Sequence, residues 1–201
     1  MKLQQKKIFL TGGCGYIGSL LIRKLLDLGY IVKCLDLFIY GDSTVKSLSN
    51  NKNFILVKGD IRDKKIIEEH MEESDIVVHL AAIVGDKPCE SAPKASYDIN
   101  FKGTKLLADI AKKNKVKKFI FASTCSNYGI SDQNKFATET SELNPVSLYA
   151  ESKIDCENLL DKYAGEDFNV IALRFGTAYG VSYRTRFDLT VNSFAYEAYK
   201  T

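Results

Sequence analysis

The stretch FLTGGCGYIG, residues 9–18, decides how this sequence folds. It joins an apolar, strand-like run to a segment, residues 16–30, whose apolar residues recur at helical spacing. Gly12, Gly15 and Gly18 stand at the junction, where a tight turn, close approach to a pyrophosphate and close helix–strand packing each need a residue without a side chain. The N-terminus of the following helix would present N–H groups and a positive dipole end to the phosphates. The stretch therefore predicts a dinucleotide-binding unit.

The rest of the chain repeats this alternation of strand and helix. Strands are expected at residues 6–12, 31–37, 54–61, 75–82, 117–124 and 169–176, and helices at 16–30, 64–74, 97–113 and 147–166. Strands that alternate with helices through short connections are typical of a parallel sheet covered on both faces. We therefore expect the α/β class, with a Rossmann-like doubly wound parallel sheet. The longest irregular stretch, 126–146, is expected to be a functional loop.

Two acidic residues follow the second and third expected strands. Asp36 comes 24 residues after Gly12, where a carboxylate can accept hydrogen bonds from an adenosine ribose diol. Because it would repel a 2′-phosphate, Asp36 favours NAD over NADP; the alternative is an aspartate that only caps the next loop. Asp60 ends the third strand at the same edge of the sheet, and we expect it to face the adenine amino group.

A second group of polar side chains follows the fifth expected strand. Ser123 and Thr124 stand in FASTCSNYG, and the next expected helix carries Tyr149 and Lys153 in SLYAESK. Positions i and i+4 share one face of a helix, so the phenol and the ammonium can act on the same small molecule. Such a pair also arises by chance on helix surfaces. Here, however, a hydroxyl, a phenol and an ammonium converge beside a predicted dinucleotide site.

The chemistry expected of this group is proton transfer to and from a substrate alcohol. A free phenol has a pKa near ~10, which is too high for a base at neutral pH. A nearby Lys153 ammonium and an oxidised nicotinamide both favour the phenolate, so we expect the pKa of Tyr149 to be lowered. Tyr149 would take the proton while hydride leaves the same carbon. Thr124 would hold the substrate oxygen, and Lys153 would also hold the nicotinamide ribose.

Composition and charge argue against several other classes. The 201 residues carry a formal net charge of +3, too little to indicate nucleic acid or a membrane as a partner, although a weakly basic patch at 111–118 stays an alternative. The five cysteines form no metal-binding pattern, so we expect no metal site. No apolar segment approaches the ~18 residues that span a bilayer. Without a secretory signal, we expect a cytoplasmic protein with free thiols.

Seven segments in a fixed order form a more specific pattern. They are TGGCGYIG (11–18), KGDIRD (58–63), HLAA (79–82), INFKGT (99–104), FASTCSNYG (121–129), YAESK (149–153) and LRFGTAYG (173–180). Together they resemble the extended short-chain dehydrogenase/reductase family, in its NAD-dependent nucleotide-sugar epimerase/dehydratase branch. The resemblance covers nearly the whole chain. It implies NAD as cofactor, a nucleotide-sugar substrate, and a homodimer formed through two helices that flank the sheet.

The family pattern carries over residue by residue. The residues that it implies for NAD are Gly12, Gly15, Tyr16, Ile17, Gly18, Asp36, Leu37, Asp60, Ile61, Leu80, Ala81, Ala82, Asn100, Ser123, Tyr149 and Lys153. Thr124, Tyr149 and Lys153 match its catalytic triad. The activity implied first resembles that of UDP-glucose 4-epimerase, in which hydride leaves a sugar carbon and returns to its other face. The alternatives are net oxidation or reduction of a nucleotide sugar, and an NAD-binding protein without turnover.

Three departures from the family pattern qualify this reading. Family dehydratases carry an acidic residue directly after the catalytic threonine, whereas Cys125 follows Thr124 here, which argues against dehydration. The segment RFGT, 174–177, replaces the RYFN that is common in epimerases, so substrate contacts there differ. Family members also continue into a smaller lobe that holds the nucleotide half of the substrate. We expect an NAD-binding domain at 1–180 and the helical start of a mostly absent lobe at 181–201.

Overall fold

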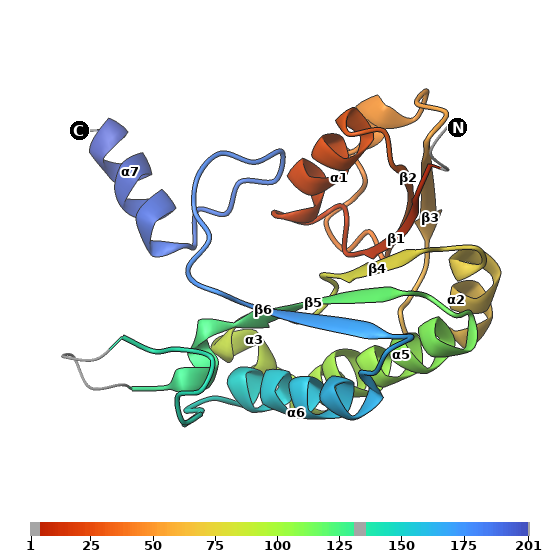
Figure 1. The fold of residues 1–201 in the computed structure, drawn as a ribbon. Helices are drawn as coiled ribbons and strands as arrows, with labels where there is room; N and C mark the ends of the chain where they lie inside the picture. The colour runs from red at the N-terminus through yellow and green to blue at the C-terminus, as the bar shows by residue number, and fades with distance from the viewer. Residues whose placement is uncertain (1–4, 131–135, 201) are drawn as a thin grey trace.

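The structure, a computed structural model, describes residues 5–130 and 136–200. A six-stranded parallel sheet forms its centre, in the order β3-β2-β1-β4-β5-β6 (Figure 1). The strands are β1 (Lys7–Thr11), β2 (Ile31–Asp36), β3 (Phe54–Lys58), β4 (Ile76–His79), β5 (Lys118–Thr124) and β6 (Asn169–Phe175). The order reverses between β1 and β4, and ligands of open α/β sheets bind at such a point, outside the carboxyl ends of the strands. The predicted Rossmann-like fold is confirmed.

Helices cover both faces of the sheet. They are α1 (Gly18–Asp27), α2 (Lys64–Met71), α3 (Asp86–Ser91), α4 (Pro93–Ser96), α5 (Thr104–Lys113), α6 (Leu148–Tyr163) and α7 (Thr190–Lys200). The chain also forms the short 3-10 helices η1 (Lys46–Leu48) and η3 (Cys125–Tyr128) and the π-helix η2 (Tyr97–Gly103). The helices α2, α5 and α6 lie on one face, over a core that includes Phe9 and Leu107. Helix α1 lies on the other face, over Leu10 and Ile22. Because successive strand residues enter opposite cores, a slip of one residue would send each side chain of a strand into the wrong core.

The helix expected at 97–113 is interrupted. Tyr97–Gly103 is a π-helix, and α5 begins only at Thr104. From the π-helix, Asn100 reaches the backbone of Ile83 in the loop after β4. Apolar periodicity does not reveal a locally wider turn, so the sequence pattern predicted one regular helix. The two short helices α3 and α4, just before it, were not predicted either.

Helix ends mostly follow the sequence signals. Gly29 lies just beyond α1 with a φ of +84°, in the left-handed conformation that commonly ends helices. The Ser147 hydroxyl accepts a hydrogen bond from the amide of Ala150 at 3.3 Å and so caps the start of α6. The helix expected in the C-terminal segment is α7. Of the loop predicted at 126–146, the first residues belong to η3, and 131–135 lie outside the described residues.

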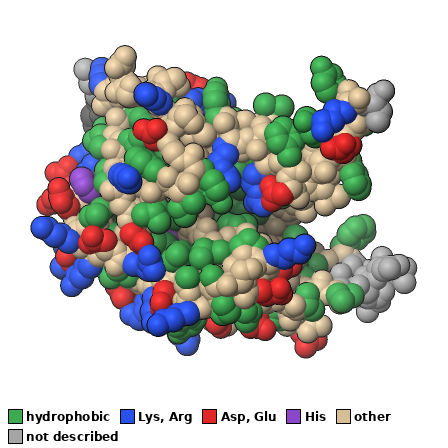
Figure 2. Space-filling view, turned by 180° about the vertical axis from the view of Figure 1, so that it is seen from behind, with side chains coloured by type: hydrophobic (Ala, Val, Ile, Leu, Met, Phe, Trp, Pro, Cys, Tyr) green, Lys and Arg blue, Asp and Glu red, His purple; other side chains and the backbone are tan. Residues whose placement is uncertain are grey.

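The carboxyl-terminal part of β6, the last strand of the sheet, is partly exposed to solvent. Val170 of β6 packs against the core beneath α5 and α6, whereas Leu173 and Phe175 are 39% and 36% exposed. Seen from behind, the molecule shows hydrophobic side chains gathered around a hollow near its middle (Figure 2). The carboxyl end of β6 thus leads into the open part of the molecule, where the candidate site lies.

Candidate active site

The glycine loop between β1 and α1 brings backbone against backbone. Gly12 has a φ of +77°, and a Cβ placed on it would lie 2.7 Å from the amide nitrogen of Ala81. A Cβ on Gly18 would lie 2.5 Å from the carbonyl oxygen of Gly12. Neither position has room for a side chain, because the neighbouring atoms belong to the backbone. The loop therefore stays thin in front of the N-terminus of α1, as close approach of a phosphate requires.

Asp36, at the end of β2, braces the same loop. Its Oδ2 accepts a hydrogen bond from the amide of Cys14 at 2.9 Å, and its Oδ1 accepts one from the amide of Phe38 at 2.8 Å. The carboxylate thus joins the glycine loop to the loop after β2. Each carboxylate oxygen can accept more than one hydrogen bond, so Asp36 can serve both loops and a ribose diol.

Asp60, after β3, is held by a neighbour that the sequence analysis missed. Its carboxylate forms an ion pair with Arg62 at 2.6 Å and accepts a hydrogen bond from the Arg62 amide at 2.8 Å. Hydrogen bonds from Arg62, aided by its charge, lower the pKa of Asp60. The contact between Asp60 and an adenine amino group stays a prediction. In such a contact, the Asp60 carboxylate would accept hydrogen bonds from both Arg62 and the adenine.

These loops open into a cleft of about 730 Å³ at the carboxyl edge of the sheet. Its lining includes every residue that the sequence analysis assigned to cofactor binding or catalysis, except Asn100. Ligand sites commonly measure ~300–1,000 Å³. The glycine loop and the two aspartates lie towards β2 and β3, and the residues predicted for catalysis lie towards β5 and α6. A thin backbone loop, a ribose acceptor and this volume suit a dinucleotide.

Asn100 supports the cleft from behind. Its side-chain Oδ1 accepts a hydrogen bond from the amide of Ile83 at 2.8 Å, and its Nδ2 donates to the carbonyl of Ile83 at 3.0 Å. Asn100 is 2% exposed, whereas Ile83 lines the cleft. The family resemblance implies for Asn100 either a structural role or a place on the cofactor side. The hydrogen bonds to Ile83 fit the structural alternative, in which Asn100 holds a cleft-lining loop.

The side chains predicted for catalysis surround the end of β5 and the start of α6. The Thr124 hydroxyl accepts a hydrogen bond from the amide of Ser126 and donates one to the Ser126 hydroxyl, each at 3.1 Å. Lys153 Nζ donates to the carbonyl of Ala122 at 2.8 Å and lies 5.8 Å from the centroid of the Tyr149 ring. Strand end and helix are thereby joined by the lysine itself.

Burial determines the protonation states of Tyr149 and Lys153. It raises the pKa of Tyr149 to about 12, and the charge of Arg186 opposes that shift only in part. It lowers the pKa of Lys153 to about 8, so the ammonium still predominates at neutral pH. Without NAD, desolvation of the phenol outweighs nearby charge. The lowering of the Tyr149 pKa by Lys153 and an oxidised nicotinamide together stays a prediction for the NAD-bound cleft. At neutral pH, Tyr149 is a neutral phenol that can donate a hydrogen bond.

A largely buried carboxylate, Glu157, connects β5, η3 and β6 at the end of the cleft that holds the residues predicted for catalysis. We call this end the catalytic end. It forms an ion pair with Arg174 of β6 at 2.6 Å and accepts hydrogen bonds from Ser123 and, at 2.9 Å, from Asn127. Arg174 also donates to the hydroxyl of Tyr128 at 2.9 Å. The Ser123 hydroxyl thus donates its hydrogen bond to Glu157, which lies outside the cleft lining, and the contact of Ser123 with NAD stays a prediction. Sequence reasoning missed this network.

His79, from the HLAA segment, links β1, β4 and α5 beneath the cleft. Its Nδ1 lies 2.7 Å from the Thr11 hydroxyl, and its Nε2 lies 2.9 Å from the Thr104 hydroxyl. Burial, and to a lesser extent the charge of Lys153, lower the pKa of His79 to about 3. A neutral imidazole donates through one nitrogen and accepts through the other. This histidine is therefore a structural link.

Residues 176–189, between β6 and α7, form a further wall of the cleft, and we call this segment the strap. Its members in the cleft lining are Gly176, Thr177, Ala178, Arg184, Arg186, Asp188 and Leu189. Arg186 forms an ion pair with Asp188 at 2.5 Å. The sequence analysis singled out only Gly176 and Thr177. The clustered charges of SYRTRFD, 182–188, are the signal that could have indicated the rest.

The switch point of the sheet and the thin glycine loop place this chain among the dinucleotide-binding α/β proteins. Residues 8–199 match the NAD dependent epimerase/dehydratase family. The chain belongs to that family of enzymes, and NAD is the cofactor for which its site is built. Within residues 5–130 and 136–200, no helix has the length and apolar character needed to cross a membrane.

Relatives with two different activities resemble the chain. A UDP-glucose 4-epimerase from Rhizobium meliloti (strain 1021) is 29% identical over 92% of this chain and 55% of the relative. A dTDP-D-glucose 4,6-dehydratase from Homo sapiens is 33% identical over 87% of this chain and 52% of the relative. The chain thus spans about half the length of the curated relatives it matches.

Solved structures that resemble the chain also include both a dehydratase and an epimerase. The dTDP-glucose 4,6-dehydratase DesIV from Streptomyces venezuelae, with NAD bound, has a TM-score of 0.86 at 26% identity, over 96% of this chain and 62% of that chain. The UDP-glucose 4-epimerase from Thermus thermophilus, in complex with NAD, has a TM-score of 0.81 at 30% identity, over 96% and 61%. Both structures share the fold and the cofactor, and they differ in the reaction.

Proposed function

We propose that this chain carries the NAD-binding and catalytic part of a nucleotide-sugar epimerase, with a reaction like that of UDP-glucose 4-epimerase. The observation that carries the proposal is the convergence of Thr124, Tyr149 and Lys153 on the cleft that the glycine loop also lines. Epimerase relatives, one of them in complex with NAD, support it. Residues 1–180 would form the NAD-binding domain, and 181–201 would begin the lobe that holds the nucleotide half of the substrate.

In this proposal, one set of residues binds NAD and another set holds the substrate and transfers its proton. The glycine loop and α1 hold the diphosphate, and Asp36 accepts hydrogen bonds from the adenosine ribose. When bound, NAD supplies a reversible hydride acceptor and brings a positive charge into the cleft. Thr124 holds the substrate oxygen. Because Tyr149 is a neutral phenol with a pKa of about 12, its acceptance of a proton depends on added positive charge, which favours the phenolate.

Dehydration is the family reaction that the proposal excludes. Protonation of a leaving hydroxyl needs an acid beside the reacting sugar. Cys125 and Ser126 follow Thr124 in the cleft lining and supply none. Asp188, on the strap, is paired with Arg186. We therefore expect no 4-keto-6-deoxy sugar from a nucleotide hexose.

The test is to incubate the NAD-loaded protein with a panel of nucleotide sugars and to read the products by NMR. Epimerised sugar without net change in NAD is the expected result. NADH formed in proportion to product would favour the alternative of net oxidation, and a 4-keto-6-deoxy product would overturn the exclusion of dehydration. Sugars left unchanged by protein that binds NAD would favour a binding protein without turnover.

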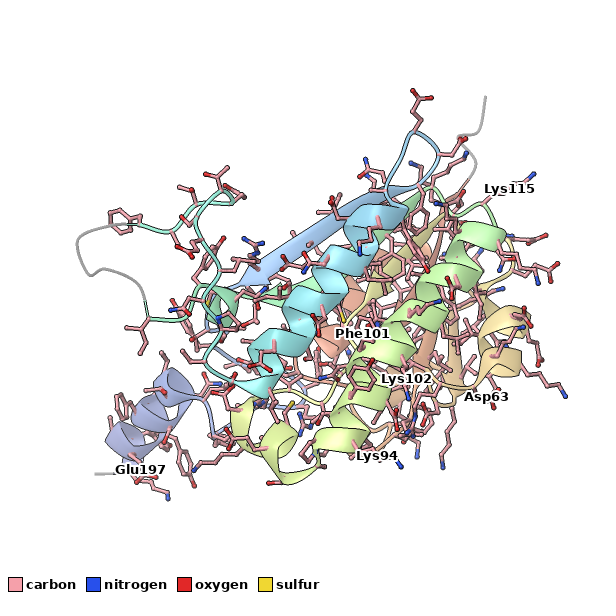
Figure 3. The ribbon with its side chains drawn as sticks, turned by 90° about the horizontal axis from the view of Figure 1, so that it is seen from below. Asp63, Lys94, Phe101, Lys102, Lys115 and Glu197 are labelled. Atoms are coloured by element: carbon pink, nitrogen blue, oxygen red, sulfur yellow. The ribbon has the colours of Figure 1, made fainter. Side chains whose placement is uncertain are left out.

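We further propose a homodimer formed through α5 and α6. The π-helix η2, which carries Phe101 and Lys102 and continues into α5, runs beside α6 (Figure 3). Near the ends of this pair, Tyr97 and Leu148 are 48% and 41% exposed. Sedimentation of the purified chain checks the proposal, and a monomer at all concentrations would contradict it. A cytoplasmic location is part of the same proposal, supported by five free cysteines.

A further inference from the structure

The strap, residues 176–189, is fastened to the glycine loop by hydrogen bonds between protein groups. The Tyr16 hydroxyl donates to the carbonyl of Gly180 at 2.7 Å and accepts from Asn192 Nδ2 at 3.2 Å. The Ser182 hydroxyl donates to the carbonyl of Tyr16 at 2.6 Å. The phenol of Tyr16, a residue assigned to the cofactor from sequence, is therefore engaged by the strap and α7. We call Tyr16, Gly180, Ser182 and Asn192 the clasp.

Two side chains of the clasp, Ser182 and Asn192, are buried and satisfied, whereas Tyr16 is half-buried and Gly180 is exposed. Asn192, on α7, is 8% exposed; its Oδ1 accepts from the amide of Gly180 at 2.8 Å, and its Nδ2 also donates to the carbonyl of Arg186 at 2.9 Å. Ser182 is 9% exposed, and its hydroxyl lies 3.2 Å from that of Ser19 in α1. A satisfied buried polar network favours one arrangement over its alternatives. The clasp thus fixes the strap against α1 and α7 together.

Two stacked cations hold the strap beyond the clasp. The Arg23 guanidinium of α1 lies 3.5 Å from the centroid of the Tyr183 ring, and the Arg184 guanidinium lies 3.4 Å from that of Tyr40. Tyr40 belongs to the loop after β2, and both Arg184 and Tyr40 line the cleft. The strap therefore runs from the glycine loop to the loop that follows Asp36, which are the two loops built for the diphosphate and the ribose.

We propose that the strap is the gate for exchange of NAD and that Tyr16 is its latch. Residues 176–189 contain no regular helix or strand, so side-chain contacts hold the strap in place. They are the clasp, the two stacked pairs, the Ser182–Ser19 contact and the ring contact between Phe187 and Tyr196. Because the clasp joins protein to protein, its strength does not depend on a bound dinucleotide. Loosening it should therefore speed both entry and exit of NAD while the equilibrium affinity stays nearly constant. The inference concerns NAD alone and holds for any sugar substrate.

Tyr16→Phe is the test variant, since it removes the hydroxyl and keeps the ring. Stopped-flow fluorescence of NADH, with NAD as competitor, measures both rate constants on the 201-residue chain. Loss of the latch hydrogen bonds should raise association and dissociation rates together by about 5- to 10-fold. The dissociation constant should change less than about twofold. Ser182→Ala removes the second clasp hydroxyl and should act in the same direction.

Tyr163→Phe is the matched control. The Tyr163 hydroxyl donates to Asp109 at 2.6 Å between α6 and α5, and neither residue lines the cleft, so both rates should stay native. If Tyr16→Phe raised only the dissociation rate, Tyr16 would be a direct contact for NAD and the gate would be wrong. Unchanged rates in both Tyr16→Phe and Ser182→Ala would overturn the proposal equally. Sugar turnover is not measured, so failure of the proposed epimerase activity would leave this result intact.

Discussion

The two ends of the cleft are built from different parts of the chain. The cofactor end is made of backbone: Gly12 and Gly18 leave no room for a Cβ, and Asp36 braces two loop amides. The catalytic end is made of side chains that hold one another, with Glu157 and Arg174 at their centre. Backbone against backbone cannot yield to a new atom, whereas a side-chain network can lose one group and keep the rest. A single substitution should therefore cause a large loss of NAD affinity at the cofactor end, and only a partial loss of stability at the other end.

Among these substitutions, Gly12→Ala should have the largest effect on the affinity for NAD. At a φ of +77°, its Cβ would lie 2.7 Å from the backbone of Ala81, so the loop must move. We expect NAD to bind at least about 100-fold more weakly, measured by calorimetric titration.

Gly29→Ala is the control for Gly12→Ala. Its φ of +84° is equally left-handed, but nothing lies within 4 Å of the added Cβ, and Gly29 is outside the cleft lining. It should cost about 1 kcal/mol of unfolding free energy and leave NAD affinity unchanged. Comparable losses of NAD affinity in the two variants would refute the role of close approach.

Asp36→Asn should have the next largest effect. The amide keeps the shape of the side chain but removes the charge that Cys14 and Phe38 face with their N–H groups. We expect NAD affinity to fall about 10-fold and the preference for NAD over NADP to narrow by a similar factor, since repulsion of the 2′-phosphate is lost. Parallel titrations with both cofactors measure the ratio, and an unchanged ratio would remove Asp36 from its proposed role.

Glu157→Gln probes the catalytic end and should act on stability. It leaves the largely buried guanidinium of Arg174 without its counter-ion, so we expect a loss of about 2 kcal/mol in the free energy of unfolding by urea. NAD affinity should stay within about threefold of the native value. Adding Arg174→Met should restore part of the lost stability, because no unpaired charge remains. Losses that simply add in the double variant would show that the pair is not coupled.

The last expected effect is a pH dependence of the free energy of unfolding. Burial lowers the pKa of Lys153 from 10.5 to about 8, so between these values the unfolded chain binds more protons than the folded chain. Stability contributed by this group therefore rises with pH in that window. Lys153→Met removes the group, and its stability relative to the native protein should fall by about 2 kcal/mol between about pH 7 and pH 9.5.

The comparison with Lys153→Met isolates the lysine from its neighbours. Tyr149, Cys89, Cys156 and Glu157 face Lys153 or act on it, and they are present in both proteins. His79, beneath it, is neutral at every pH in this range. Urea unfolding at about pH 7, 8 and 9.5 measures the difference, and a difference that stays constant with pH would contradict the assigned pKa of Lys153.

The difference between the backbone-built cofactor end and the side-chain-built catalytic end also explains which features the sequence could predict. The glycine loop and Asp36 were found because their spacing in the chain directly reflects backbone geometry. The clasp was missed because Tyr16 and Asn192 meet only in the fold, from opposite ends of the chain. The rise that burial gives the pKa of Tyr149 was missed because a helical pattern shows which residue is a neighbour but not how deeply the phenol is buried. Contacts between distant side chains and depth of burial are properties of the packed molecule.

The most direct test of the central claim compares native and Tyr149→Phe protein, both loaded with NAD, on a panel of nucleotide sugars read by NMR. Tyr149→Phe removes only the phenolic oxygen that would exchange a proton with the sugar. We expect turnover to fall by about 10²- to 10⁴-fold. NAD affinity, measured on the same samples, should stay within about threefold. A Tyr149→Phe protein that keeps near-native turnover would contradict the assignment of Tyr149 as the proton acceptor.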